Sequence, residues 1–216
     1  MPRAVFASHN AHKRDEVWAI LAPLLPGWEA HDLASARDFD IPPPVEDGVT
    51  FAENALVKAR AVCGATGLPT VADDSGIAVN VMGGAPGIFS ALWSGKHGAD
   101  SENLELLLAQ LVDIKDEHRG AAFVCAAALV LPDGTEAVFE GRMEGSIARA
   151  ASGGGGFGYD PIFVPAGGDV TAAELTAEHK NSLSHRGQAF RLLAPRLAAL
   201  GEFNPSHRVD VSGRWR

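Results

Sequence analysis

The sequence predicts a protein of the α/β class. Segments with the apolar pattern of strands alternate with segments of helical periodicity along the chain. With 216 residues, 46% of them hydrophobic, the chain is long enough to bury a sizeable core, as one domain or as one domain with two lobes. We therefore expect a sheet with helices packed against it.

The predicted elements of the first half are, in order, a strand over 3–7, a helix over 11–25, a strand over 28–33, an extended segment over 41–45 and a helix over 50–66. The turn at 8–10 supplies a cap for the first helix, which ends before Pro26 and Gly27. Thr50 and Glu53 have the spacing of a capping box, so they mark the start of the second helix. The prolines of 41–45 exclude a helix there.

The predicted elements of the second half are strands over 68–72 and 77–81, a loop over 83–87, a helix over 100–112, a hairpin of 121–131 with 136–141, and a last helix over 185–200. A Pro-Asp-Gly turn between two apolar runs indicates the hairpin. We expect the hairpin to form a smaller, β-rich lobe. We assign 1–203 to a single two-lobed domain and 204–216 to a polar C-terminal tail.

Composition restricts the possible partners. The formal net charge of −9 would repel a phosphate backbone, so we expect no nucleic-acid partner. No segment reaches the length of about 18 apolar residues that crosses a membrane, and no charged-then-apolar leader opens the chain. Cys63 and Cys125 have no metal-ligand spacing and are expected to be buried free thiols. These features predict a cytoplasmic protein that does not bind membranes.

Asp73 and Asp74 are the strongest candidates for chemistry. They follow a short apolar strand and precede Gly76, at the predicted junction of a strand and a turn. Successive side chains of an extended chain point to opposite faces, so the two carboxylates cannot both face one ligand. One could hold a divalent metal or polarise a water while the other caps the turn. The alternative is that both cap a solvated loop.

Three further segments could bind phosphate or metal. The turn over 8–13 combines free backbone N–H groups, a hydroxyl and Lys13, which suit a polyphosphate, although an ordinary helix cap would look the same. Lys58 shares a helix face with Asn54 and could reach a phosphate or extend into water. Glu46 precedes a glycine turn and could complete a Mg²⁺ site with Asp74, or be an exposed loop acid.

The glycine-rich run over 153–160 presents two aromatic residues. Phe157 and Tyr159 have the same-face spacing of an extended chain and could stack a base; the alternative is a flexible hairpin with two core aromatics. Lys180, His185 and Arg186 crowd the predicted start of the last helix, where the dipole disfavours cations. This conflict suggests that they meet an external anion or carbonyl group.

Six ordered motifs together resemble one family, the inosine/xanthosine triphosphate pyrophosphatases. They cover roughly residues 3–200 and lie at 8–13, 51–59, 72–76, 83–88, 156–161 and 184–187. The resemblance implies Mg²⁺-dependent hydrolysis of ITP, dITP and XTP to the monophosphate and pyrophosphate. It also implies a homodimer, and an elongated mixed β-sheet with flanking helices and two lobes around the site.

Carried over by position, the resemblance implies a role for each matching residue. The triphosphate would be bound by Ser8, His9, Asn10, Ala11, His12, Lys13 and Lys58. Asp74 would be the proton acceptor and a metal ligand, with Glu46 as the second carboxylate, and Ser75 would contact substrate. The base would be held by Phe157, Gly158, Tyr159 and Asp160, while Lys180, His185 and Arg186 would contact phosphate and base.

This sequence departs from the family pattern at His9 and His12, which add bulk where the backbone approaches phosphate. The expected chemistry is attack of a water on the α-phosphorus, with no covalent intermediate. Arg186 and nearby N–H donors would select a 6-keto purine. Two alternatives stay open: a related pyrophosphatase for modified pyrimidine or methylated nucleotides, and a nucleotide-binding sensor without turnover.

Overall fold

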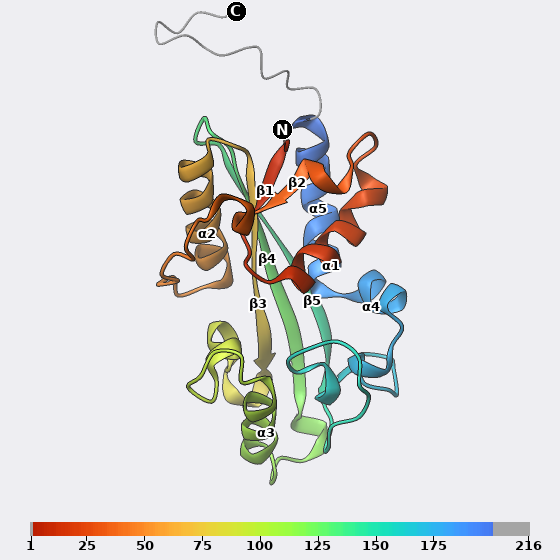
Figure 1. Cartoon of the computed structure of the whole chain (residues 1–216). Helices are drawn as coiled ribbons and strands as arrows, with labels where there is room; N and C mark the ends of the chain where they lie inside the picture. The colour runs from red at the N-terminus through yellow and green to blue at the C-terminus, as the bar shows by residue number, and fades with distance from the viewer. Residues whose placement is uncertain (1, 201–216) are drawn as a thin grey trace, which may run out of the picture.

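The computed structural model describes residues 2–200, apart from the side chains of residues 11 and 12, and contains one six-stranded sheet of order β2-β1-β3-β4-β5-β6 (Figure 1). The strands are β1 (Ala4–Phe6), β2 (Leu33–Ser35), β3 (Thr70–Val79), β4 (Gly120–Val130), β5 (Glu136–Ile147) and β6 (Phe163–Pro165). β1 is parallel to β2 and β3, whereas β3 to β6 are antiparallel neighbours. The sheet is therefore mixed, and the predicted α/β class is confirmed.

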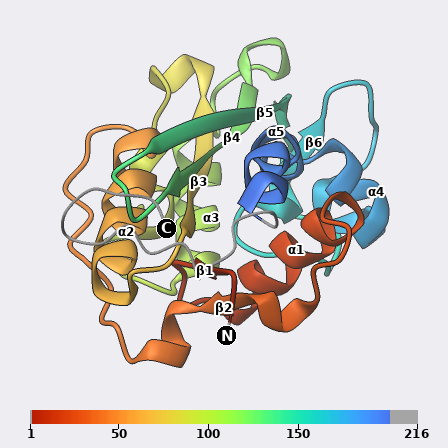
Figure 2. The same ribbon diagram turned by 90° about the horizontal axis from the view of Figure 1, so that it is seen from above.

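Five α-helices accompany this sheet in the described part of the chain. They are α1 (Ala11–Leu21), α2 (Phe51–Thr66), α3 (Asp100–Gln110), α4 (Ala177–Leu183) and α5 (His185–Leu200). α2 covers one face of the sheet and α5 with α1 the other (Figures 1 and 2). The two faces follow from strand alternation: Val71 packs into the α1/α5 core, whereas Ala72 packs into the α2 core. None of the helices in the described residues could span a bilayer.

A third apolar core lies at the other end of the long strands. Ile77 of β3 and Phe123 of β4 pack there with Leu107 of α3 and with Phe163. β3, β4 and β5 thus run through both halves of the molecule (Figure 1). The hairpin does not start a separate sheet, because its strands are shared by both halves. The domain limit at 203 falls outside the described residues and stays a prediction.

The predicted turn at Asp73 and Asp74 is wrong. β3 is one continuous strand from Thr70 to Val79, and the two aspartates pair in register with Ala127 and Ala126 of β4. A full ladder with a strand of small residues satisfies the backbone without a turn. Gly76 is needed for close packing and not for a turn, because a Cβ at this position would collide with Ser90 Oγ.

Several element boundaries also differ from expectation. The strand predicted over 28–33 is β2, shifted to Leu33–Ser35, because the chain first forms a 3₁₀ helix whose Glu29 and Asp32 make a capping box. The first helix ends at Leu21 and continues as a 3₁₀ helix containing Pro23, and the strand predicted over 136–141 extends to Ile147. α4 was not predicted. The capped start of α2 and the start of α5 at His185 are confirmed, and α5 continues to Leu200, the last described residue.

Candidate active site on the central strand

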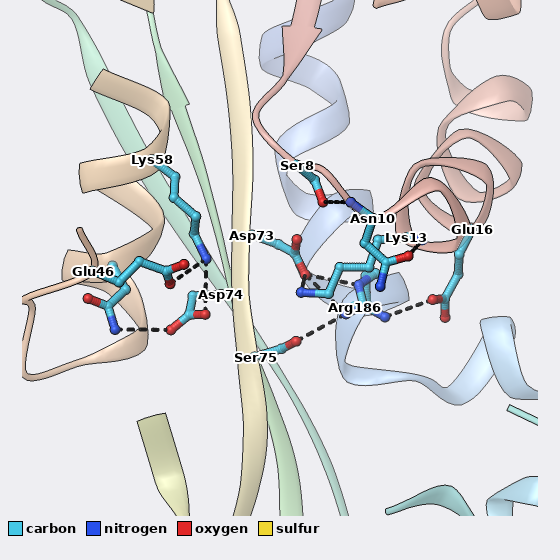
Figure 3. Close-up of polar contacts among 11 residues, drawn as sticks. Ser8, Asn10, Lys13, Glu16, Glu46, Lys58, Asp73, Asp74, Ser75 and Arg186 are labelled. Carbon is cyan, nitrogen blue, oxygen red and sulfur yellow. Dashed lines mark hydrogen bonds and ion pairs between the residues drawn. The ribbon is translucent and has the colours of Figure 1, made fainter. Parts of the chain in front are cut away.

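The site is organised around three consecutive residues in the middle of β3. Asp74 points toward α2, while Asp73 points toward α1 and α5 (Figure 3). The prediction that the two carboxylates face opposite directions is confirmed, although they do so on a strand and not in a turn. Ser75 completes the group through its contact with Arg186, the same guanidinium that pairs with Asp73 (Figure 3).

On the α2 side, two carboxylates meet one lysine. Lys58 Nζ lies 3.1 Å from Asp74 Oδ1 and 2.9 Å from Glu46 Oε2. Asn54 Nδ2 donates to the other Asp74 oxygen over 3.4 Å, and Asn54 Oδ1 accepts from the backbone N–H of Gly48 over 2.8 Å. One turn of α2 therefore holds the extended segment that carries Glu46 beside β3. The structure brings together the three residues that the sequence singled out here.

Burial and ion pairing together set the pKa values of this cluster. Burial raises the pKa of Asp74, and the nearby Lys58 ammonium only partly offsets it. Burial alone would lower the pKa of Lys58, but the carboxylates of Asp74, Asp73 and Glu46 outweigh it and raise that pKa. Lys58 is therefore a cation, and Asp74 is a carboxylate with increased basicity.

The chemistry of this donor set fits Mg²⁺. Mg²⁺ is commonly held by one or two carboxylates together with substrate phosphates and waters. One oxygen of Asp74 and one of Glu46 both contact the Lys58 ammonium, which lies between them. Within residues 2–200 no group of three or more acidic, histidine or cysteine side chains forms a complete metal cage. The pair could hold a cation that also contacts a substrate.

On the opposite face of β3, the buried Asp73 pairs with two cations. Arg186 Nε lies 3.1 Å and Lys13 Nζ 3.5 Å from Asp73 Oδ2. Arg186 also donates to Glu16 over 2.7 Å and to Ser75 Oγ over 3.0 Å. Burial alone would raise the pKa of Asp73, but Lys13, Arg186 and Lys58 hold it well below its usual range. Asp73 is therefore a permanent anion.

This arrangement corrects the expectation for Arg186. Its position at the start of α5 was expected to require an external carbonyl or anion. Instead, three internal partners, Asp73, Glu16 and Ser75, meet the buried guanidinium. The unfavourable helix dipole is compensated inside the protein, by carboxylates more than 100 residues away in the sequence.

The turn before α1 is held by its own polar groups. Asn10 is the N-cap of α1, with its side-chain oxygen accepting from the Lys13 N–H over 3.3 Å, and Ser8 Oγ accepts from the Asn10 N–H over 3.2 Å. His9 Nε2 lies 2.7 Å from the Ile41 carbonyl oxygen, so its ring is held against the proline-rich segment. The side chains of Ala11 and His12 lie outside the described structure.

The glycine-rich loop presents one aromatic ring, not two. Phe157 is 43% exposed, whereas Tyr159 is buried and donates its hydroxyl to the Ser90 carbonyl oxygen over 2.8 Å. Gly156 and Gly158 have φ of +72° and +59°, so the loop turns and does not have the extended spacing that was assumed. Asp160 closes this turn by accepting from the Phe157 N–H over 2.8 Å.

The exposed ring lies beside the cations of the site. Lys180 Nζ is 5.2 Å and the Arg186 guanidinium carbon 5.7 Å from the Phe157 ring centroid. Lys180 belongs to α4, not to the start of α5 as expected, and pairs with Asp160 at 2.7 Å. The loop thus brings an aromatic face next to the charged network around Asp73.

His185 is a core residue. Its ring stacks on Phe123 with centroids 5.0 Å apart, and its buried Nδ1 has no hydrogen-bond partner among the described residues. Burial, together with the Arg186 and Lys180 cations, lowers the pKa of His185 well below its ordinary value. The imidazole is neutral, so His185 does not supply charge for a phosphate.

Sequence reasoning missed Glu16 as a member of the site. Glu16 lies three residues after Lys13 on α1, and this spacing places both on one helix face. That spacing was the available signal, but nothing local connects Glu16 to Arg186 at the far end of the chain. Asn54 was noted for its spacing from Lys58, but its bond to Asp74 was not foreseen.

A family model and several known proteins match most of this chain in sequence. A model of the Ham1 family matches residues 4–196. The dITP/XTP pyrophosphatase of Streptomyces coelicolor is 60% identical over 197 residues, which cover 90% of this chain and 96% of that protein. The dITP/XTP pyrophosphatase of Nocardia farcinica is 54% identical over 203 residues, which cover 94% and 98% of the two chains.

Solved structures agree in fold. The nucleoside-triphosphatase, or dITP/XTP pyrophosphatase, of Mycobacterium abscessus superposes with a TM-score of 0.72 at 53% identity, covering 89% of this chain and 98% of that one. A HAM1 protein from Coxiella burnetii superposes with a TM-score of 0.82 at 39% identity, covering 92% of this chain and 100% of that one. The similarity therefore extends over the whole sheet and the site that it carries.

Proposed function

We propose, since this chain belongs to the Ham1 family, that it hydrolyses non-standard purine nucleoside triphosphates such as ITP, dITP and XTP to the monophosphate and pyrophosphate. Such a reaction removes deaminated purines from the nucleotide pool. Relatives at 60% and 54% identity carry the name dITP/XTP pyrophosphatase. The observation that carries the proposal is the cluster of Glu46, Lys58 and Asp74 on one side of β3, with Lys13 on the other.

In the proposed reaction, Asp74 accepts the proton of the water that attacks the α-phosphorus. The raised pKa of Asp74 suits this role, because a base accepts a proton better as its pKa approaches the working pH. Lys13 and Lys58 would neutralise charge on the departing pyrophosphate. Mg²⁺ held by Asp74 and Glu46 would add positive charge to the triphosphate and polarise the water. No residue needs to form a covalent bond to substrate.

The base would stack on the exposed ring of Phe157. Lys180 flanks this ring and carries only N–H donors. A 6-keto oxygen can accept from a donor, whereas the amino group of adenine would face donors without an acceptor. This contact would favour inosine and xanthosine over adenosine.

The supporting inferences are a homodimer, a cytoplasmic location and Mg²⁺ as the metal. The resemblance supports the homodimer, the proposed action on the nucleotide pool supports the cytoplasmic location, and the donor set of Asp74 and Glu46 supports Mg²⁺. Light scattering on the purified protein measures its oligomeric state. Activity assays with and without Mg²⁺ test whether the reaction depends on this metal.

Product analysis tests the proposal. ITP with Mg²⁺ should yield IMP and pyrophosphate in one step, while primary formation of IDP and orthophosphate would contradict attack at the α-phosphorus. Rates for ITP, dITP, XTP, ATP, GTP, dUTP and methylated triphosphates separate this function from its alternatives. A preference for pyrimidines or methylated bases would indicate the related pyrophosphatase, and binding without turnover would indicate a sensor.

A further inference from the structure

Lys58 occupies the point that a divalent cation would need. Its ammonium lies 2.9 Å from Glu46 Oε2 and 3.1 Å from Asp74 Oδ1, between the two carboxylates proposed to hold the metal (Figure 3). The side chains of Lys58 and Asp74 are 13% and 14% exposed, so water does little to screen the contact between them, whereas Glu46 is 41% exposed and its contact is screened more. In the metal-free protein Lys58 is the cation that balances the two acids.

The ammonium and a metal ion cannot occupy this point together. Mg²⁺ binds carboxylate oxygens at about 2.0–2.1 Å. An ion that bridges the same two oxygens would enter the space beside Lys58 Nζ, which contacts them from 2.9 and 3.1 Å, and the two cations would repel each other. Metal binding therefore requires Lys58 to give up both carboxylate partners.

A nucleoside triphosphate would give the displaced ammonium a new partner. Lys58 has a flexible four-carbon stem, so its charged end can move while its backbone stays in α2. A phosphate oxygen contacting the metal would lie within reach of an ammonium that has just left the metal ligands. Without a phosphate, the displaced ammonium would lose two ion pairs and gain only water.

We infer that Lys58 is an exchangeable placeholder, which holds Glu46 and Asp74 together until metal and triphosphate bind as a pair and then transfers to phosphate. The inference rests on the proposed function, because it uses the same two carboxylates and the same substrate class. Its consequence is that the nucleotide-free protein binds divalent cations weakly. Metal and triphosphate should therefore bind cooperatively, each increasing the affinity for the other.

Lys13 supplies the matched control. It is also a partly buried lysine near the acids, but its partner is Asp73, 3.5 Å away, and it contacts neither Asp74 nor Glu46. Asp73 keeps Arg186 as a partner whether or not Lys13 is present. Replacing Lys13 thus removes one positive charge from the region but leaves Lys58 between Asp74 and Glu46.

The test measures Mn²⁺ and Mg²⁺ binding to the nucleotide-free protein by calorimetry and Mn²⁺ binding by electron paramagnetic resonance. Lys58→Met should bind both metals about tenfold more tightly than the wild type, because two ion pairs no longer compete. Lys13→Met should remain within about threefold of the wild type, since only long-range repulsion changes. Lys58→Arg, which keeps the charge, should bind metal no better than the wild type.

Equal metal affinities for Lys58→Met and Lys13→Met would overturn the placeholder role. Adding Glu46→Gln to Lys58→Met should remove most of the gain, and a retained gain would also contradict the inference. Thermal unfolding of each variant confirms that it is folded. These results do not depend on turnover, so product analysis with ITP still decides the proposed function independently.

Discussion

Asp73 and Asp74 are neighbours in the sequence, yet their carboxyl groups have opposite electrostatic surroundings. Asp73 has its pKa held low by Lys13, Arg186 and Lys58, which outweigh its burial. Asp74 has its pKa raised, because burial outweighs the attraction of Lys58. The alternation of a strand is the cause, since it directs one side chain into the α1/α5 network and the other toward α2. The first acid is structural and the second can act as a base.

Asp74→Asn should lower kcat for ITP by about a thousandfold, because the amide cannot accept the proton of the attacking water. The side chain keeps its size, so the melting temperature should stay close to that of the wild type. Steady-state kinetics at saturating Mg²⁺ and a thermal melt check both statements. Near wild-type turnover would mean that another group is the base.

Arg186→Ala should chiefly cost stability. The substitution leaves Asp73 and Glu16 without their main partner, and loss of one member of a buried charge network costs about 3–5 kcal/mol. Urea unfolding measures this cost. An unchanged midpoint would show that water can replace the ion pairs of Arg186 without loss of stability.

Lys180→Ala is a cleaner probe of base selection than a change at Arg186, whose loss would disturb the buried charge network. Lys180 lies beside the Phe157 ring and has only Asp160 as a carboxylate partner among the described residues. The substitution should lower the ratio of kcat/KM for ITP over ATP. Equal losses with both nucleotides would assign Lys180 to phosphate.

His185 should make stability depend on pH below about 6.5. The pKa of His185 is lowered in the folded protein, so between that value and about 6.5 the unfolded chain binds more protons. The free energy of unfolding therefore falls as the pH falls through this window, by up to about 1.4 kcal/mol per pH unit. Urea titrations at about pH 7.5 and 5.5, on either side of the unperturbed histidine pKa, measure the change. His185→Phe, which can still stack on Phe123, should show a smaller decrease, and an equal decrease would assign the effect to other groups.

At the scale of elements, β3 passes through the site without a break because its neighbour β4 is built of small residues. Ala126 and Ala127 lie opposite the two aspartates and leave room for the groups around them. The 3₁₀ helix Gly87–Leu92 also packs directly onto Gly76, and its Ser90 Oγ accepts from the Ile77 N–H over 2.9 Å. Glycine at 76 is required by this close approach.

Gly76→Ala should destabilise the protein by about 1–3 kcal/mol, because the new Cβ would collide with Ser90 Oγ and the Gly87 carbonyl oxygen. Gly64→Ala is the matched control. Gly64 lies inside α2, where an added methyl group would meet open space, so this change should stabilise by about 0.5–1 kcal/mol. Chemical denaturation of both variants measures the difference, and two changes of the same sign would contradict the packing argument.

At the scale of the whole molecule, the site lies where the two halves share their strands. The triphosphate-binding candidates Lys13 and Lys58 come from α1 and α2 (Figure 3), whereas the loop that carries Phe157 also places Tyr159 in the core with α3. β3 contributes Val71 to one core and Ile77 to another. A substrate bound here would contact both halves, while the continuous strands hold those halves in place.

The shared strands predict cooperative unfolding. Trp28 packs in the core with α1 and α5, and Trp93 packs against the core with α3. Two variants that each retain one of these tryptophans, with the other three of the chain's four replaced by Phe, should give coincident urea transitions by fluorescence and by circular dichroism. Separate midpoints would mean that the two halves fold independently, against the single domain predicted from the sequence.

Features that depend on near neighbours could be predicted from the amino-acid order alone. Thr50 and Glu53 specify the start of α2, alternation places Asp73 and Asp74 on opposite faces, and helical spacing puts Asn54 and Lys58 together. Each of these features involves atoms within a turn or a few residues of one another. The motifs at 8–13, 51–59 and 72–76 were grouped by the family resemblance, and the structure brings Lys13 to Asp73 and Lys58 to Asp74.

The meeting of distant groups could be read only from the folded chain. The two carboxylate partners of Arg186 are 113 and 170 residues away in the sequence, and the hydroxyl of Tyr159 donates to a carbonyl 69 residues away. Pairing with β4 makes a strand of the segment that was expected to turn. Such contacts depend on how whole elements pack, and a local pattern carries no information about which buried charge will face another. Burial and ion pairing together then set the pKa of each acid, because both act only once the chain is folded.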